Sequence, residues 1–548
     1  MIRRFLATVN AHVSSAPNSG TVEAMPPITA PHGMVATPHP LATAAGLAAL
    51  RAGGTAVDAA VAANAMLAVV YCNACGIGGD AFALVWDPIE SRLHGFNGSG
   101  RAASGLTIEI VRAAGHETMP QRGPFTVDVP GAVDAWAQLL ERFGRRSLAD
   151  AIVPAAAVAD DGYELTAVNV RSIAAGLPTF DPAARAVFGR AGGPGDTFRQ
   201  PLLAASLRAI ADGGREAYYG GPIGEEIARA VQAAGGALTA DDIAAHRGDW
   251  VDPISSRYRD LEVATIPPNS QGITALIALN VLERLGWPTG GARSVERIHA
   301  QIEAMKVAWS ERDRCVADPA RALCDPAELL TDGHARWLGS RLSVGRALRF
   351  TPTNPPGGGT VYLCAADADG MLVSLIESNY LGFGSGPMGG ASGIMLQNRG
   401  ASFSLDPSHP NALAPGARPL HTLMPGMLLR DGRAEAALGA MGGDGQPQTM
   451  VQLVTGLVDD GLDPQAVIDR PRWVVQATGP GTPLGPVSIE SDGVDPETVD
   501  ALRALGHEVE LVEPRTPLMG WAQMVRRRPD GSYEGGADPR ADSVVAGL

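Results

Sequence analysis

The most informative pattern of apolar and polar positions in this chain lies between residues 360 and 378. An apolar run from Thr360 to Ala365 is followed by Asp367-Ala-Asp-Gly370 and then by a second apolar run, Met371 to Ile376. Asp-Gly between two such runs is a strong short-range signal for a β-hairpin. The pattern therefore predicts two antiparallel strands, with Thr360 at the start of the first.

Elsewhere the pattern predicts mainly helices before residue 310 and mainly strands after residue 360. Pro40 to Arg51 has helical spacing and is followed by Gly53-Gly54, a typical helix stop. Asp58 to Val70 is almost wholly apolar, so we expect a buried helix. Strands are expected at 361–366, 371–378, 393–397, 424–430 and 434–438. Two separate domains, or helices on both sides of two stacked sheets, would each give this order.

Composition and charge exclude several classes of partner. Of the 548 residues, 45% are hydrophobic and 18% are charged, which is ordinary for a globular protein. The formal net charge of −15 argues against nucleic acid and anionic membranes. The longest apolar stretch, Ala59 to Tyr71, is too short to span a bilayer. The N-terminal residues lack the apolar run of a secretory signal. We therefore expect no nucleic-acid partner and no membrane partner.

The cysteines and histidines predict no metal or redox site. The five cysteines are Cys72, Cys75, Cys315, Cys324 and Cys364. An odd number in a long chain is typical of reduced thiols and favours a cytoplasmic location. The single CxxC pair has no second pair beside it, so we expect buried small residues there. The eleven histidines show no metal-ligand spacing.

Thr360 follows three glycines, and this junction has two interpretations. In the simpler one, a β-branched residue begins a strand. In the other, the bond between Gly359 and Thr360 is cut, and the new α-amine, with a pKa of roughly 7.7–8.0, takes the proton of the Thr360 hydroxyl. Glycine permits the strained backbone that would help such a cut. This stretch alone leaves both interpretations open.

A second glycine-rich stretch, Gly439 to Gln446, lies between a predicted strand and a predicted helix. It is either a tight turn or a set of backbone N–H groups at a helix start, suited to an oxyanion. A nearby nucleophile would favour the second. The GxGxxG pattern from Gly384 to Gly389 has no helix after it, so nucleotide binding is not expected.

From about Gly33 to the end, the chain resembles the γ-glutamyltranspeptidase family of N-terminal-nucleophile hydrolases. The matching segments follow one order: Gly53-Gly-Thr-Ala-Val-Asp58, Gly76-Ile-Gly-Gly, Val129-Pro-Gly, Glu216-Ala-Tyr-Tyr-Gly, Pro267-Pro-Asn-Ser-Gln-Gly, His299 to Ala308, Thr360, Phe383-Gly-Ser-Gly, Ser392-Gly-Ile, Arg418-Pro-Leu and Gly442-Gly443. The resemblance implies an α/β fold, a four-layer αββα sandwich, made as a proenzyme.

The resemblance also implies how the chain is divided. Residues 1–32 would be a flexible leader. Self-cleavage between Gly359 and Thr360 would give a large subunit, 1–359, of which 33–359 follows the leader, and a small subunit, 360–548. The two would form a processed α/β heterodimer, with a dimer of these as a further possibility.

In the chemistry that the resemblance implies, Thr360 is the nucleophile and its amine the base. Ser378 would support the Thr360 hydroxyl, and the N–H groups of Gly442 and Gly443 would bind the oxyanion. Attack on an amide carbonyl would give an acyl-enzyme, which water or an amine would then resolve. No metal and no organic cofactor is implied.

The implied substrate pocket departs from the usual pattern of the family. The family's carboxylate-binding arginine falls near Ser99, and Arg101 is the candidate to replace it. The acidic residue that binds a substrate amine falls at Ser402, which removes a charge-assisted hydrogen bond of roughly 1.5–3 kcal/mol. The other expected substrate-binding residues are Asn379, Tyr380, His421, Thr422 and Asp444.

The sequence thus favours hydrolysis of a small carboxylate-bearing amide, with a γ-glutamyl or short acidic acyl group. An oxamate amidohydrolase or a C–C bond hydrolase of secondary metabolism would use the same scaffold, because a fold and its catalytic centre do not fix the acyl group. A non-catalytic homologue that is never cut is the alternative outside the enzymes.

Overall fold

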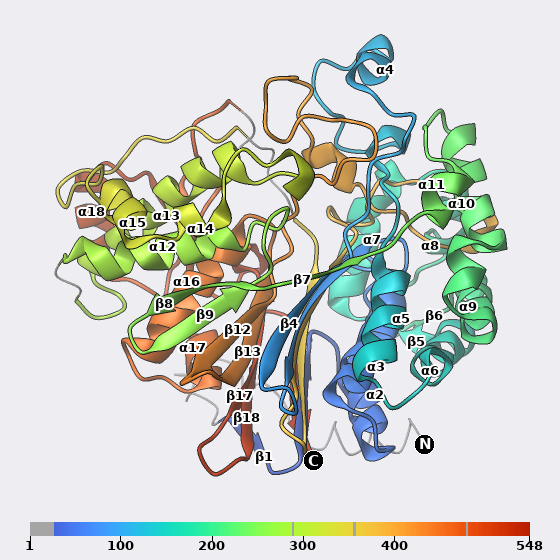
Figure 1. Ribbon diagram of the computed structural model, residues 1–548, viewed down its shortest axis with the longest axis horizontal. Coiled ribbons are helices and arrows are strands. Elements are labelled where there is room, and N and C mark those ends of the chain that lie inside the picture. Colours follow the sequence, from blue (N-terminus) through green and yellow to red (C-terminus); the bar gives the residue numbers. More distant parts are fainter. Residues whose placement is uncertain (1–26, 288–289, 354–357, 478–480) are drawn as a thin grey trace.

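The computed structural model describes residues 27–287, 290–353, 358–477 and 481–548. Two seven-stranded sheets are stacked face to face, with helices on both outer sides (Figure 1). This is the four-layer αββα sandwich that the resemblance implied. Most of the expected leader, residues 1–26, lies outside the described residues. The described part of that leader includes a strand, Ile28–Ala30, so the ordered fold begins before Gly33.

Both sheets consist of antiparallel neighbours. The first contains, in spatial order, β19 (Val544–Gly547), β2 (Gly33–Thr37), β10 (Val361–Asp367), β11 (Leu372–Ser378), β3 (Asp80–Asp87), β4 (Arg92–Asn97) and β7 (Asp249–Val251). The second contains β1 (Ile28–Ala30), β18 (Tyr533–Ala537), β17 (Trp521–Arg527), β13 (Arg433–Met441), β12 (Gly426–Arg430), β9 (Leu261–Thr265) and β8 (Ile254–Tyr258). The predicted hairpin is confirmed as β10 and β11, at the centre of the first sheet.

Strand β10 shows why this hairpin is apolar at nearly every position. Val361 and Leu363 belong to the core under the outer helices, whereas Tyr362 and Cys364 belong to the core between the sheets. Successive side chains of a strand point to opposite faces, and here both faces are buried. A sheet covered on both sides therefore needs continuous apolar runs rather than an alternating pattern.

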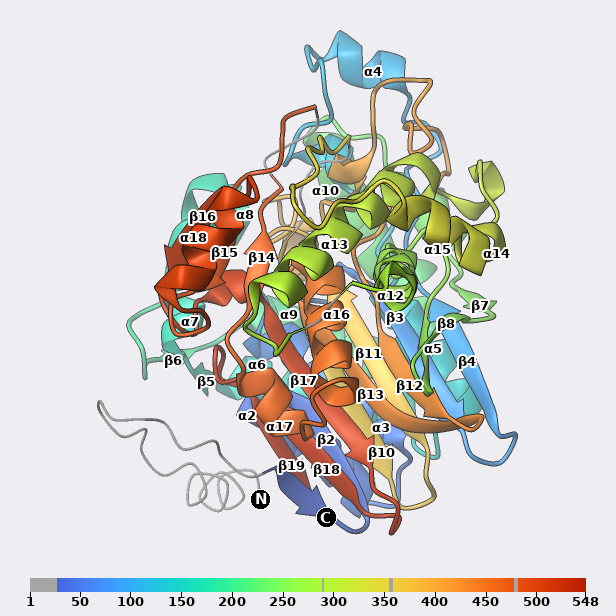
Figure 2. The same cartoon turned by 90° about the vertical axis from the view of Figure 1, so that its left-hand side faces the viewer.

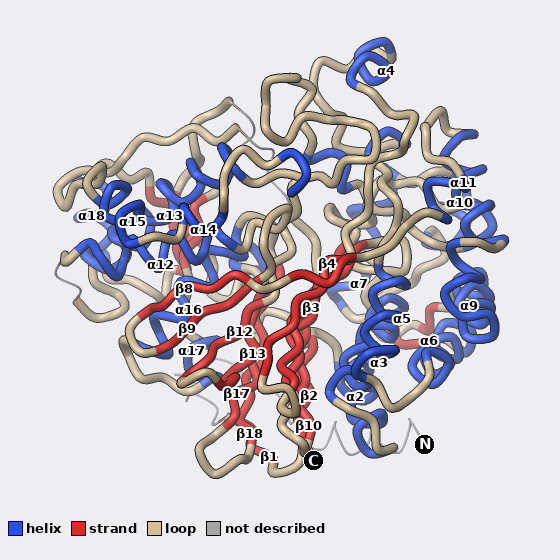
Figure 3. Tube along the Cα trace, in the orientation of Figure 1, coloured by secondary structure: helices blue, strands red, loops and turns tan. Residues whose placement is uncertain are grey.

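Two layers of helices cover the outer faces (Figure 3). Helices α2 (Pro40–Arg51), α3 (Ala56–Val70), α5 (Ala132–Phe143), α6 (Leu148–Asp161) and α9 (Pro201–Tyr219) lie outside the first sheet. Helices α12 (Ile273–Leu285), α13 (Val295–Cys315), α16 (Gly445–Val458) and α17 (Pro464–Asp469) lie outside the second. All 15 residues of α3 are buried, which confirms the prediction of a buried helix.

The remaining elements lie at the periphery of the sandwich. The helices are α4 (Ile108–Ala113), α7 (Ala167–Gly176), α8 (Pro182–Phe188), α10 (Pro222–Ala233), α11 (Ala240–Ala244), α14 (Pro326–Leu329), α15 (Asp332–Gly339) and α18 (Pro496–Ala504). A three-stranded sheet contains β14 (Trp473–Val475), β15 (Val487–Glu490) and β16 (Val509–Val512), and a pair contains β5 (Tyr163–Glu164) and β6 (Thr197–Phe198).

The parts of the chain before and after Thr360 are interleaved. Strands β10 and β11 follow Thr360 in the sequence but lie between β2 and β3, which precede it. The last strand, β19, pairs with β2 at the edge of the same sheet (Figure 2). The two segments that cleavage would produce therefore share both sheets and are not separate domains.

The predicted strand at 393–397 is wrong. Gly390 and Gly393 have positive φ angles of 58° and 72°, which a strand does not accommodate. The run is a buried loop that makes only an isolated bridge between Met388 and Met395. Its residues are apolar because the loop is buried. A buried loop and a buried strand give the same apolar run, so the sequence pattern could not distinguish them.

The prediction of reduced thiols is wrong for one pair of cysteines. Cys315, the last residue of α13, forms a disulfide with Cys324. Cys72, Cys75 and Cys364 are free and buried, as expected for the CxxC pair. The cysteine count therefore gives no argument for a cytoplasmic location. Among the described helices, none combines the length and the apolar character needed to cross a membrane.

We expect protein that is denatured without reductant to show three titratable thiols, and five after reduction, because one pair is bonded. Thiol titration with a chromogenic disulfide measures this directly. The control is the double variant Cys315→Ser/Cys324→Ser, which should give three under both conditions. Five thiols before reduction would contradict the disulfide.

Candidate active site

Thr360 lies immediately before β10, and Ser378 is the last residue of β11. The register of the hairpin pairs Val361 with Glu377, so the residues next to them come together at one end of the sheet. The Thr360 Oγ1 is 3.3 Å from the Ser378 Oγ, and Thr360 is only 1% exposed. The predicted nucleophile and its supporting hydroxyl are thus adjacent.

The carbonyl oxygen of Gly359 accepts hydrogen bonds from both hydroxyls. Thr360 Oγ1 donates to it at 2.7 Å and Ser378 Oγ at 2.5 Å. Gly359 has a φ of 93°, and a Cβ atom there would lie 2.6 Å from the Tyr380 carbonyl oxygen. Only glycine fits this position, so the requirement for Gly359 before Thr360 is both conformational and steric.

Tyr380 connects this centre to a buried arginine that the sequence analysis did not select. Its backbone N–H donates to Ser378 Oγ at 2.7 Å, and its own φ is 76°. The Arg399 guanidinium carbon lies 4.0 Å above the Tyr380 ring, within cation–π range. Arg399 Nη1 donates to Thr422 Oγ1 at 3.0 Å. Ser378, Tyr380, Arg399 and Thr422 therefore form one continuous set of contacts.

Gln271 joins this set to the glycine-rich stretch before α16. Its Nε2 donates to the carbonyl oxygens of Thr422, at 3.0 Å, and Gly443, at 2.9 Å. Its Oε1 accepts from Arg312 Nη1 at 3.2 Å, and Arg312 also donates to Asp444 Oδ1 at 2.5 Å. The loop that carries Gly442, Gly443 and Asp444 is thereby held beside Thr422.

The backbone of Gly442 and Gly443 is compatible with an oxyanion site at a helix start, the second interpretation of this stretch. Gly442 and Gly443 have φ angles of 133° and 55°, and α16 begins two residues later with Asp444 at its N-cap. Backbone N–H groups at a helix start form a favourable site for a negatively charged oxygen. The predicted strand, glycine-rich turn and helix start are all confirmed.

His421 forms a buried dyad with Asp80. Its Nε2 donates to Asp80 Oδ2 at 3.1 Å, and its Nδ1 accepts from the Leu423 N–H. Burial, with Arg399 nearby, holds the pKa of His421 well below its usual range, so the ring is neutral. Burial raises the pKa of Asp80 to about 7. Asp80 also accepts hydrogen bonds from Gly100, Gly131 and Gln397.

Among the described residues, the side chains of Arg101 and Asn379 form no hydrogen bond and no ion pair with this set. Arg101 is 45% exposed in its side chain, donates to the Gly416 carbonyl and lies 3.6 Å from Asp318. The Asn379 side chain is buried against Gly79, and neither of its amide atoms has a hydrogen-bond partner among the described residues. Of the predicted substrate-binding residues, the set includes Tyr380, Thr422, Asp444 and also His421, whose carbonyl oxygen accepts from the Gln271 N–H at 2.8 Å.

Arg399 and Asp128 are among the charged residues of this region that the sequence analysis missed. Both are 0% exposed. Arg399 stands in a run without a recognisable motif, so nothing in the sequence distinguishes it from a surface arginine. Asp128 precedes the matching segment Val129-Pro-Gly, and an aspartate beside a family motif was a usable signal.

Two groups of histidine and carboxylate side chains among the described residues lie apart from this set of contacts. His299, Glu303 and His507 are close enough for a metal ion, as are Asp87, Glu90 and His94, so the prediction of no metal-ligand spacing was incomplete. The members of the first group already pair without an ion: His299 with His507, and Glu303 with Lys306 and the Leu348 N–H.

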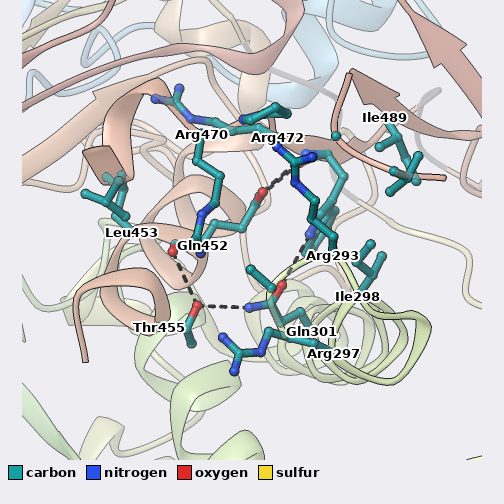
Figure 4. Close-up of a pocket in the computed structure, with 16 residues that line it drawn as sticks. Arg293, Arg297, Ile298, Gln301, Gln452, Leu453, Thr455, Arg470, Arg472 and Ile489 are labelled. Carbon is teal, nitrogen blue, oxygen red and sulfur yellow. Dashed lines mark hydrogen bonds between the residues drawn. The ribbon is translucent and has the colours of Figure 1, made fainter. Parts of the chain in front are cut away.

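The pocket in Figure 4 also contains none of the predicted site residues. It lies between α13, α16 and β14 and is rich in arginine. Arg297 and Arg470 both bind Asp460, and Arg472 binds Asp538. These guanidinium groups are therefore already balanced by carboxylates.

Comparisons with known proteins identify the family. A family model described as gamma-glutamyltranspeptidase matches residues 42–548. The chain belongs to the gamma-glutamyltranspeptidase family. It is accordingly a hydrolase of the N-terminal-nucleophile type, and its fold is that of this family.

Three relatives match over nearly their whole length. The "Glutathione hydrolase-like YwrD proenzyme" of Bacillus subtilis is 40% identical over 523 residues, 94% of this chain and 98% of that protein. The "Oxamate amidohydrolase proenzyme" of Klebsiella pneumoniae is 38% identical, with 94% and 98% covered. The crystal structure of a cephalosporin acylase from Bacillus halodurans superposes with a TM-score of 0.90 at 39% identity, covering 97% and 99%.

Glu377, next to Ser378, provides a pH test of this buried region. Its carboxylate accepts from the Gly76 N–H and from Asn64 Nδ2, both at 2.7 Å, and burial raises its pKa from 4.5 to about 8. Between these values the folded state holds a proton that the unfolded state has released. The free energy of unfolding therefore falls as pH rises, by at most about 1.4 kcal/mol per pH unit for this group.

We expect Glu377→Gln to lose less stability than the wild type between pH 5 and pH 7.5, because glutamine does not titrate. Denaturant unfolding of both proteins at the two pH values, in the same state of chain cleavage, measures the difference. The raised pKa values of Asp80 and Asp128 act in the same direction in both proteins. Equal pH dependence would contradict the raised pKa of Glu377.

Proposed function

We propose that this protein cuts its own chain between Gly359 and Thr360 and then hydrolyses the amide bond of a small carboxylate-bearing substrate through an acyl-Thr360 intermediate. The observation that supports this is the pair of hydroxyls, from Thr360 and Ser378, that meet on the Gly359 carbonyl oxygen. A structural hairpin alone would not need this convergence or the constrained glycine.

In the proposed self-cleavage, Thr360 Oγ1 attacks the carbonyl carbon of Gly359. The C–O bond forms as the C–N bond to Thr360 breaks, and the hydroxyl proton passes to the released amine. Water then hydrolyses the resulting ester and leaves the Gly359 carboxylate. Ser378 Oγ already donates to the carbonyl oxygen on which negative charge develops, so it stabilises the transition state.

In the proposed catalytic cycle, the freed amine of Thr360 takes the proton of its own hydroxyl. The hydroxyl attacks the substrate amide, and the N–H groups of Gly442 and Gly443 bind the oxyanion at the start of α16. The Thr360 ammonium group then gives this proton to the leaving nitrogen of the substrate, which departs as an amine and leaves an ester on Thr360. Water releases the acid, whereas an acceptor amine would complete transfer.

The relatives' names support a short acyl group. One is called glutathione hydrolase-like and another an oxamate amidohydrolase, at similar identities. We propose a γ-glutamyl or short acidic acyl donor, with an oxamate-type amide as the second candidate. The word "proenzyme" in both names supports processing here between Gly359 and Thr360, into subunits 1–359 and 360–548 that stay together as a heterodimer.

We expect intact-mass measurement of denatured wild-type protein to show two species, ending at residue 359 and beginning at residue 360. Thr360→Ala should give one chain of 56.6 kDa without amidase activity, because it lacks the attacking oxygen. Thr360→Ser is the matched control: it retains a hydroxyl and should still be cut. Cleavage at the same bond in Thr360→Ala would rule out this mechanism.

Ser378→Ala should slow self-cleavage by roughly 10²–10³-fold, the usual effect of removing one donor to a developing oxyanion. The rate of disappearance of the uncut chain measures this. Ser374→Ala is a suitable control, since Ser374 is a buried serine of the same strand that bonds Tyr362 and Gly426 instead. Equal rates in the two variants would remove Ser378 from the mechanism.

A further inference from the structure

We propose that Arg399 and Asp128 form the binding site for the head group of the acyl donor. Arg399 would bind its carboxylate, and Asp128 would accept a hydrogen bond from an amino or hydroxyl group on the same acyl chain. This inference rests on the proposed function and deepens it. It places acyl recognition at residues that the family resemblance did not supply.

Arg399 is a buried cation with unused donors. Only its Nη1 has a partner, the hydroxyl of Thr422; Nε and Nη2 have none among the described residues. It forms no ion pair with any described carboxylate, although it is 0% exposed. Burying a charge without a partner costs several kcal/mol, and the planar fork of a guanidinium matches a carboxylate bound through two oxygens.

Asp128 complements Arg399, because its acceptor oxygens also lack hydrogen-bond partners among the described residues. Both of its oxygens lack partners within the described chain, and it too is 0% exposed. A Cβ atom on Gly400 would lie 3.2 Å from Asp128 Oδ1, so this carboxyl is beside the residue that follows Arg399. Two adjacent side chains, one with free donors and one with free acceptors, are both satisfied by a ligand that carries an acceptor and a donor.

The charges around Arg399 favour an anionic ligand. Burial and the neighbouring Asp80 raise the pKa of Asp128 well above its usual range, and burial raises that of Asp80 to about 7. Burial lowers the pKa of Arg399 only to about 10, so the guanidinium remains charged at neutral pH. The His421 ring, on the other side of Asp80, is neutral. The charged guanidinium of Arg399, with two donor nitrogens that have no partner among the described residues, is thus suited to pair with a substrate carboxylate.

The position of Arg399 fixes the distance from head group to reaction centre. On one side it lies 4.0 Å above the ring of Tyr380, whose N–H binds Ser378. On the other it binds Thr422, which Gln271 links to Gly443. A carboxylate held there is separated from the hydroxyl pair by Tyr380 and from the glycine loop by Thr422 and Gln271, which suits a short acyl group. Arg101, by contrast, is engaged by Gly416 and Asp318.

The test is calorimetric titration of the purified protein, with its chain cleavage established by intact mass, using product acids that need no turnover. Oxalate, malonate, succinate and glutarate are compared with the monocarboxylates of equal length. At least one dicarboxylate should bind more tightly than its monocarboxylate. Arg399→Met should weaken that binding roughly 10- to 100-fold, as for loss of a charge-assisted pair, and Arg399→Lys should restore part of it.

Two further arginine variants test whether the loss of dicarboxylate binding is specific to Arg399. Arg297→Met is the matched control, because it removes another largely buried guanidinium whose partner Asp460 stays paired with Arg470. It should bind the dicarboxylates as the wild type does. Arg101→Met tests the alternative anchor. Weaker binding in Arg101→Met together with unchanged binding in Arg399→Met would overturn the proposal.

Asp128→Asn tests the second half of the site with the pairs aspartate and succinate, and glutamate and glutarate. The wild type should prefer the amino-bearing member of at least one pair, and the variant should lose that preference. No preference in the wild type would overturn the role of Asp128. No dicarboxylate binding by cut protein, or equal binding by wild type and Arg399→Met, would overturn the role of Arg399 and leave amide hydrolysis at Thr360 untouched.

Discussion

The hydrogen bonds from Thr360 and Ser378 to one carbonyl oxygen are the interaction on which the rest of the site depends. They exist because the end of a central hairpin brings its first and last residues together. The strands of that hairpin are held on both faces by buried apolar side chains, so their register cannot slip without exposing a core. The positive φ and the tight packing of Gly359 then aim the carbonyl at the two hydroxyls. The geometry at the bond between Gly359 and Thr360 therefore depends on the fixed register of the buried sheet.

Around this bond, burial has an electrostatic effect as well as a steric one. Asp80, Asp128 and Glu377 all have raised pKa values because water is excluded from them, so carboxyls that would be anionic at the surface retain protons here. Arg399 keeps its charge under the same conditions. The region is consequently more positive than its composition suggests, within a protein whose overall charge is −15. The charge of this region is therefore set by local burial and not by the net charge of the protein.

The sequence predicted the parts of the fold whose signals are local. The hairpin at Thr360, the buried helix α3 and the glycine-rich turn before α16 each follow from a short pattern. The buried loop at 393–397 was mistaken for a strand because apolar content reports burial, and only the glycine φ angles separate the two. The disulfide between Cys315 and Cys324 spans only nine residues of sequence, and the hydrogen bond from Arg399 to Thr422 joins two different segments. Neither contact has a recognisable sequence motif, so the adjacency of Thr360 and Ser378 was predictable from the sequence, whereas the surroundings of Arg399 were not.

Because the two segments are interleaved, cleavage would change how the protein refolds. Before cleavage, unfolding and refolding involve a single chain and do not depend on concentration. After the proposed cut, β10 and β11 belong to one chain and their neighbours β2 and β3 to another. Renaturation would then require two molecules to meet and to insert a hairpin into the middle of a sheet, so it becomes a second-order and slow process. The mature form would persist through a high barrier to unfolding rather than through its ability to refold.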